Sequence, residues 1–110
     1  MVSISESVSE NHKAFVKAYS NAIDENIKNL SGKEALSESY ARIAAVNAVK
    51  VDIIDQYFSP EAAQFFFEAH NDAVLSHVNA SIGCWRPALQ ALRSFMENTF
   101  SAIYYAEHPA

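Results

Sequence analysis

Four side chains near the end of the sequence could act together on a phosphate or a proton. Arg93, Glu97, Tyr104 and His108 follow one another at intervals of four, seven and four residues. On a helix these intervals place all four side chains within one narrow arc. A guanidinium donates two parallel hydrogen bonds to phosphate oxygens, and an imidazole exchanges protons near neutral pH. The pattern predicts an anion or phosphate site, with a structural Arg93–Glu97 ion pair as the alternative.

An apolar stripe runs beside this arc on the same helix. Its members recur every three or four residues: Leu89, Leu92, Met96, Phe100 and Ile103. Arg93 stands at the boundary of the stripe, so we expect it to be half-buried. A half-buried guanidinium needs an anionic or carbonyl partner, and Glu97 lies one turn further on.

Other reactive side chains are sparse. His70 and His77 are seven residues apart on one predicted helix, whereas two ligands of one metal from a single helix stand three or four apart. No Glu-x-x-His pair is present, so neither a metal nor another cofactor is predicted. Cys84 precedes a helix and could be a nucleophile activated by His77. The alternative is a small buried thiol in a turn.

Composition restricts the class of protein. The chain has 110 residues, half of them apolar, and a net charge of −5. This length and apolar content predict one domain over residues 1–110. The negative charge argues against a general nucleic-acid surface. A single cysteine is typical of the reducing cytoplasm, and no apolar run reaches the roughly 20 residues of a membrane helix.

The hydrophobic periodicity predicts helix throughout. Four helices are expected at about residues 5–30, 31–58, 60–82 and 86–106. Ser31 and Glu34 have the spacing of a capping box, and Ser59-Pro60 is a second helix start. Gly83 permits a left-handed turn. The short connections favour antiparallel neighbours, so the predicted fold class is all-α, an up-down antiparallel four-helix bundle.

The aromatic residues indicate an interface. Phe65, Phe66 and Phe67 are consecutive and must point in three directions from a helix, so one bundle core cannot take all three. Charged residues are also scarce after Ala62, so the C-terminal half is expected to be buried on more than one side. The predicted anchors are Phe65, Phe66, Trp85, Phe100, Tyr104 and Tyr105. The expected partner is a second copy or another protein. A small-ligand pocket between the last two helices remains an alternative.

Residues 91–109 resemble a segment of HEPN-type helical bundles. The resemblance rests on Ala91-Leu92-Arg93-Ser94-Phe95-Met96-Glu97-Asn98 and on Ile103-Tyr104-Tyr105-Ala106-Glu107-His108-Pro109. These bundles occur in bacterial toxin–antitoxin and phage-defence systems, and many are dimeric RNases. Their catalytic Arg is followed four to six residues later by a His, whereas Asn98 stands at that place after Arg93 here.

The resemblance implies a helical fold and dimerisation, with RNase activity through Arg93 as the alternative function. The leading hypothesis is a non-catalytic interaction protein of the bacterial cytoplasm. Under this hypothesis neither a membrane nor a nucleic acid is a partner, and RNA enters only with the RNase alternative.

Overall fold

The structure, a computed structural model, describes residues 3–108 and is all-helical over that range. Helix α1 (Ile4–Leu30) is followed by α2 (Glu34–Val49), which continues without a break through η1 (Lys50–Ile54) and α3 (Asp55–Tyr57). Two more long helices complete the chain, α4 (Pro60–Ser81) and α5 (Trp85–Glu107). The four predicted helices are thus confirmed to within a few residues at each end.

Two of the predicted helix boundaries have the expected chemistry. The Ser59 hydroxyl accepts a hydrogen bond of 3.3 Å from the Ala62 N–H, and Pro60 is the first residue of α4. Gly83 has φ of +85°, the left-handed conformation that ends α4 and allows α5 to return beside it.

The capping box was predicted at the wrong place. Ser31 is the C-cap of α1, and its N–H donates to the Ile27 carbonyl, while Lys33 is the N-cap of α2. Ser31 is therefore not free to cap the next helix. The capping box is formed by Ser3 and Glu6, where each side chain accepts a hydrogen bond of 3.2 Å from the other residue's N–H.

A wider helical turn interrupts the second helix. Residues 50–54 form a π-helix, in which residues five apart share a side. Lys50 Nζ accordingly lies 2.8 Å from Asp55 Oδ2, and the buried Ile54 lies within the same segment.

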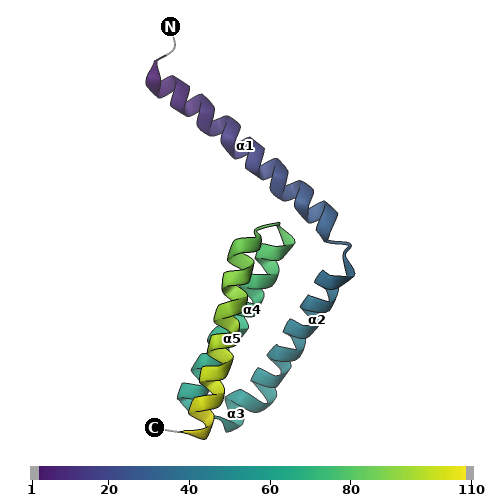
Figure 1. Cartoon of the computed structure of the whole chain (residues 1–110), viewed down its shortest axis with the longest axis vertical. Helices are drawn as coiled ribbons and strands as arrows, with labels where there is room; N and C mark the ends of the chain where they lie inside the picture. The colour runs from purple at the N-terminus through teal and green to yellow at the C-terminus, as the bar shows by residue number, and fades with distance from the viewer. Residues whose placement is uncertain (1–2, 109–110) are drawn as a thin grey trace.

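Helices α4 and α5 form an antiparallel hairpin and lie side by side along their length (Figure 1). Their seam is made of small residues, because the buried residues here are Ala62 and Ala69 of α4 and Ala88 and Ala102 of α5. The Ser76 hydroxyl also donates a bond of 2.8 Å across the seam to the Ala88 carbonyl. Small side chains let two helix backbones approach closely.

The four helices do not form one compact body within a single chain. Helix α2 packs on α4, but α1 contacts α4 only near the hairpin turn (residues 82–84) and projects beyond it (Figure 1). The radius of gyration is 19.7 Å. A compact domain of about 100 residues has a radius of about 13 Å. The residues buried in the described chain are Ile54 and the four seam alanines.

Candidate protein interface

A continuous apolar surface lies on the outer side of α5. Its members occur every three or four residues, so they form a stripe along the helix. Each member is between 45% and 65% exposed, and the set is Trp85, Leu89, Leu92, Met96, Phe100, Ile103 and Tyr104. We call this set the α5 stripe.

The α5 stripe is exposed because a different face of α5 packs on α4. Ala88 and Ala102 enter the hairpin seam, and Phe95 between them is half-buried. The expectation that the C-terminal half is buried on more than one side is therefore wrong for the single chain. The hairpin buries the face with the smaller side chains and leaves the larger ones outside.

Five of the six predicted anchors fall into two groups. Trp85, Phe100 and Tyr104 belong to the exposed α5 stripe. The Phe65 ring stacks on Tyr105, with centroids 5.2 Å apart and an interplanar angle of 6°, so this pair joins α4 to α5. Phe66 is half-buried.

The exposed member of the three consecutive phenylalanines is Phe67. Its side chain is 47% exposed, and the Lys50 ammonium lies 5.3 Å from its ring centroid. A cation over an aromatic face is a stabilising contact. Phe67 therefore belongs to the contact between α4 and the π-helical turn.

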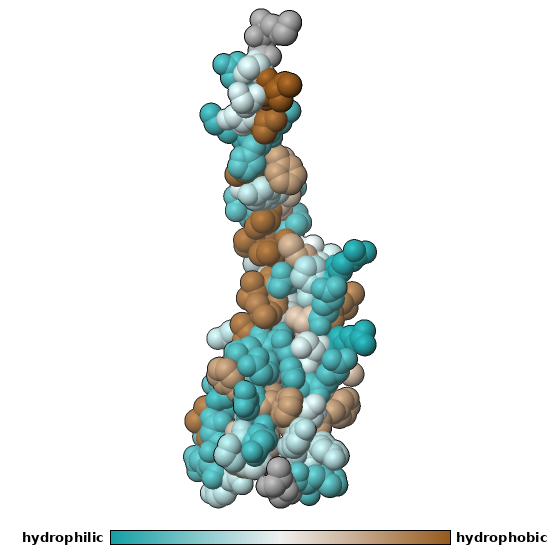
Figure 2. All heavy atoms as spheres, turned by 90° about the vertical axis from the view of Figure 1, so that its left-hand side faces the viewer, coloured by the Kyte–Doolittle hydropathy of each residue, from teal (hydrophilic) through white to brown (hydrophobic). Residues whose placement is uncertain are grey.

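A second apolar surface follows α1, where no interface was expected. Its members lie on one helical face and are between 43% and 85% exposed: Ile4, Val8, Phe15, Tyr19 and Ile27. Figure 2 shows apolar atoms in a band along the projecting part of the molecule. We call this set the α1 stripe. The spacing in the sequence indicated the face, but its exposure follows from the position of α1.

The four residues of the predicted anion site form two separate pairs. Arg93 Nε lies 3.0 Å from Glu97 Oε1, and the Tyr104 and His108 rings stack with centroids 4.5 Å apart. His108 Nδ1 also lies 3.1 Å from the Tyr104 carbonyl oxygen. The seven residues from Glu97 to Tyr104 separate the pairs by about 10 Å along the helix.

Arg93 is not half-buried. Its side chain is 83% exposed and that of Glu97 is 65% exposed, because both lie on the solvent side of the hairpin. An exposed pair four residues apart on a helix contributes only a few tenths of a kcal/mol to stability, about 0.3–0.5 kcal/mol.

A half-buried polar link between α4 and α5 was not predicted from the sequence. Asp72 Oδ2 accepts hydrogen bonds from Ser94 Oγ at 2.7 Å and from Asn98 Nδ2 at 2.8 Å. All three residues are half-buried. The signal in the sequence was the i,i+4 spacing of Ser94 and Asn98, which places both on the face that meets α4.

A groove opens between α2 and α5, with α4 as its floor. Both outer helices pack on α4, and the space between them includes a cavity of about 230 Å³. Its apolar lining comes from all three helices: Ile43, Val46, Ala73, Leu92 and Phe95. Leu92 belongs to the α5 stripe, so the stripe and the groove are continuous.

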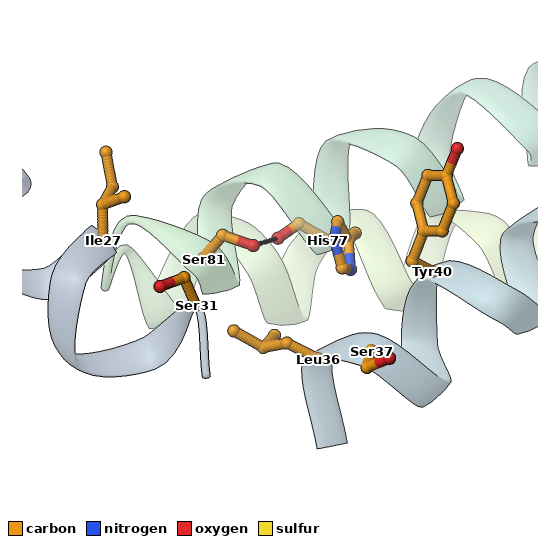
Figure 3. A pocket seen from close by; sticks show the side chains of 7 residues that line it. All are labelled: Ile27, Ser31, Leu36, Ser37, Tyr40, His77 and Ser81. Atoms are coloured by element: carbon orange, nitrogen blue, oxygen red, sulfur yellow. Dashed lines mark hydrogen bonds between the residues drawn. The ribbon is translucent and has the colours of Figure 1, made fainter. Parts of the chain in front are cut away.

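Another pocket lies next to the connection between α1 and α2, on the side that faces α4. It has a volume of about 340 Å³, and Ile27, Leu36, Tyr40 and His77 are among the residues that line it (Figure 3). The His77 Nδ1 lies 3.0 Å from the Ser39 hydroxyl, which ties α4 to α2. This pocket lies among α1, α2 and α4. A small-ligand pocket was expected between the last two helices, and α4 and α5 do both line the 230 Å³ cavity, together with α2.

Cys84 is half-buried at the N-cap of α5, and its backbone N–H donates to the Asn79 carbonyl. Over residues 3–108, no three His, Cys, Asp or Glu side chains are grouped closely enough to hold a metal ion. Within the same range, no helix has the length and apolar content needed to cross a membrane.

Comparison with known proteins finds no matching family model, no matching curated protein and no matching solved structure. The class is therefore defined by the architecture alone. It is an elongated all-helical protein with apolar stripes on α1 and α5 and an apolar groove between α2 and α5.

Proposed function

We propose that the protein acts by association and forms a homodimer through the α5 stripe. The observation that carries the proposal is the exposure of this stripe, seven large apolar side chains at 45–65%. Large contiguous apolar patches on soluble proteins mark interaction sites. Trp85 and Tyr104 are of residue types that often contribute most to binding energy in interfaces. Phe100 lies on the same stripe as these two residues.

The energetics support association. Full burial of a large apolar side chain contributes about 1.5–3 kcal/mol relative to full exposure. Over residues 3–108, the single chain buries only Ile54 and four alanines almost completely, which is little for a range of this length. The large apolar side chains therefore keep much of their surface exposed in the single chain, and this surface is available for contact with another chain.

The assembly proposed here is an up-down antiparallel four-helix bundle. Three helices already have this relation, since α2 packs on α4 and α4 pairs with α5. The groove between α2 and α5 is the place where a fourth helix would complete the bundle. Together with the resemblance of residues 91–109 to HEPN-type bundles, this supports a non-catalytic cytoplasmic protein of a bacterial defence or toxin–antitoxin system.

The test is the mass of the intact protein in solution. Size exclusion with light scattering, at two concentrations about a hundredfold apart, should give twice the 12.2 kDa chain mass. Phe100→Glu should give the single-chain mass with unchanged helical circular dichroism, because it places a charge in the stripe. Gln90→Glu is the matched control, since it adds the same charge at an exposed position outside the stripe.

The control variant should keep the mass of the parent protein. A single-chain mass for the parent at both concentrations would overturn the proposal. A Phe100→Glu variant that remains dimeric would show that another surface holds the chains together, and the α5 stripe would be excluded.

A further inference from the structure

The two apolar stripes have matching lengths. Helix α1 has 27 residues and α5 has 23, so they extend about 40 Å and about 35 Å. In antiparallel order Phe15 falls opposite Arg93, but three pairs of apolar positions coincide: Ile4 falls opposite Tyr104, Val8 opposite Phe100, and Tyr19 opposite Leu89. All six of these side chains are at least 45% exposed in the chain.

The direction of α1 prevents it from covering its own α5. Asn26 Nδ2 donates a hydrogen bond of 3.1 Å to the Ile82 carbonyl at the hairpin turn. From that point the rest of α1 extends away from the hairpin (Figure 1). Because α1 projects beyond the hairpin turn, it can reach the hairpin of a second copy when the hairpin turns of the two copies face each other.

The fourth helix of an up-down bundle would lie in the groove between α2 and α5. Helices α2 and α5 both run away from the end of the molecule that holds the hairpin turn, and the C-terminal end of α1 lies near that turn (Figure 1). A helix placed in the groove with its C-terminal end at the turn would therefore run antiparallel to both. This is the direction that the fourth helix of an up-down bundle requires. The charged residues of α1 lie off its apolar face, so none of them is buried by the contact.

From these observations we propose that two copies exchange their α1 helices. The α1 stripe of each copy lies in the groove between α2 and α5 of the other, against the α5 stripe. This inference rests on the proposed homodimer, and it specifies that α1 of the second copy is the helix that fills the groove. Two-fold exchange covers both stripes in both copies, and each half of the dimer becomes a four-helix bundle.

The connection between α1 and α2 is the hinge of this exchange. It consists of residues 31–33, and a Cβ at Gly32 would meet nothing within 4 Å. Short hinges favour exchange between chains, whereas longer ones let an arm fold back on its own chain. The same helix contacts could form within one chain if this connection allowed α1 to reverse.

Cross-linking between two differently tagged chains tests the contact directly. Both chains carry Cys84→Ser, one adds Val8→Cys and the other adds Phe100→Cys. After the two are unfolded and refolded together, a short bismaleimide should join the two tags. Glu10→Cys in place of Val8→Cys is the matched control, because residue 10 lies on the opposite face of α1 and should give little cross-linked product.

The outcomes separate this inference from the proposed homodimer. A dimeric mass with the 8–100 cross-link between chains supports both. A dimeric mass without that cross-link overturns the exchange and leaves the homodimer standing. A single-chain mass overturns both, and an 8–100 cross-link within one doubly substituted chain would then show that α1 folds back.

A hinge variant provides a second test that leaves both stripes intact. A Gly/Ser insertion of about six residues after Gly32 gives α1 the freedom to reverse. We expect the dimer to become a monomer of equal helicity. A dimer held by direct pairing of two α5 stripes would keep its mass after this insertion, and that result would overturn the exchange.

Discussion

The side-chain amide of Asn26 bonds to the carbonyl of Ile82 at 3.1 Å, across 56 residues of sequence. This bond joins the last turns of α1 to the turn between α4 and α5. The amide lies so close to Gly83 that a Cβ at residue 83 would overlap it. The hairpin turn and the arm are therefore held by one small cluster of atoms.

Replacement of Asn26 by Ala should loosen the attachment of α1. Loss of the bond to Ile82 is expected to reduce stability by about 1 kcal/mol, since that carbonyl loses its side-chain donor. Urea denaturation gives the stability change, and hydrogen exchange over residues 24–33 should accelerate. Asn29→Ala, at an exposed position of the same helix, is the control and should change neither quantity. Equal effects of the two substitutions would contradict this role of Asn26.

Gly83→Ala should destabilise the protein for two reasons. The left-handed conformation costs a residue with a Cβ about 1–2 kcal/mol. The new Cβ would also displace the Asn26 amide, at a further cost of about 1 kcal/mol.

The two effects can be separated. In an Asn26→Ala background, Gly83→Ala should lose only the backbone part, so the two substitutions should not be additive. Gly32→Ala is the comparison, because its Cβ would meet nothing within 4 Å. Strict additivity in urea denaturation would show that residues 26 and 83 are independent.

Asp72→Ala should reduce stability by about 2–3 kcal/mol, because Ser94 and Asn98 would lose their shared charged acceptor. Asp72→Asn keeps one acceptor oxygen and should lose less. Glu68→Ala removes an exposed carboxylate one turn earlier on α4 and should stay within about 0.5 kcal/mol of the parent. A similar loss for Glu68→Ala would mean that charge, rather than the bonds across the seam, explains the effect.

Ala69→Leu tests the close approach of α4 and α5. Ala69 is completely buried in the seam, so a larger side chain must push the helices apart, at a cost of about 1–3 kcal/mol. Thermal unfolding should show a lower Tm. Asn71→Leu adds the same side chain at an exposed position of α4 and should leave the Tm nearly unchanged. An unchanged Tm for Ala69→Leu would exclude a tightly packed seam.

The helices and their ends follow from local signals. As predicted, α4 begins at Ser59-Pro60, and Gly83 forms the left-handed turn that follows α4. Both features depend on a few neighbouring residues. Ser31 shows where such signals are ambiguous. The same serine could end one helix or begin the next, and the bond from its N–H to Ile27 places it at the end of α1.

The sequence by itself determined an all-helical chain, the four helix ranges and the apolar face of each of the stripes on α1 and α5. Only the tertiary structure decided which face of α5 meets α4. That choice depends on the small residues of both helices together, Ala62 and Ala69 against Ala88 and Ala102. The position of α1 also depends on one side-chain bond to a residue 56 positions away, and no local pattern encodes a contact over that distance.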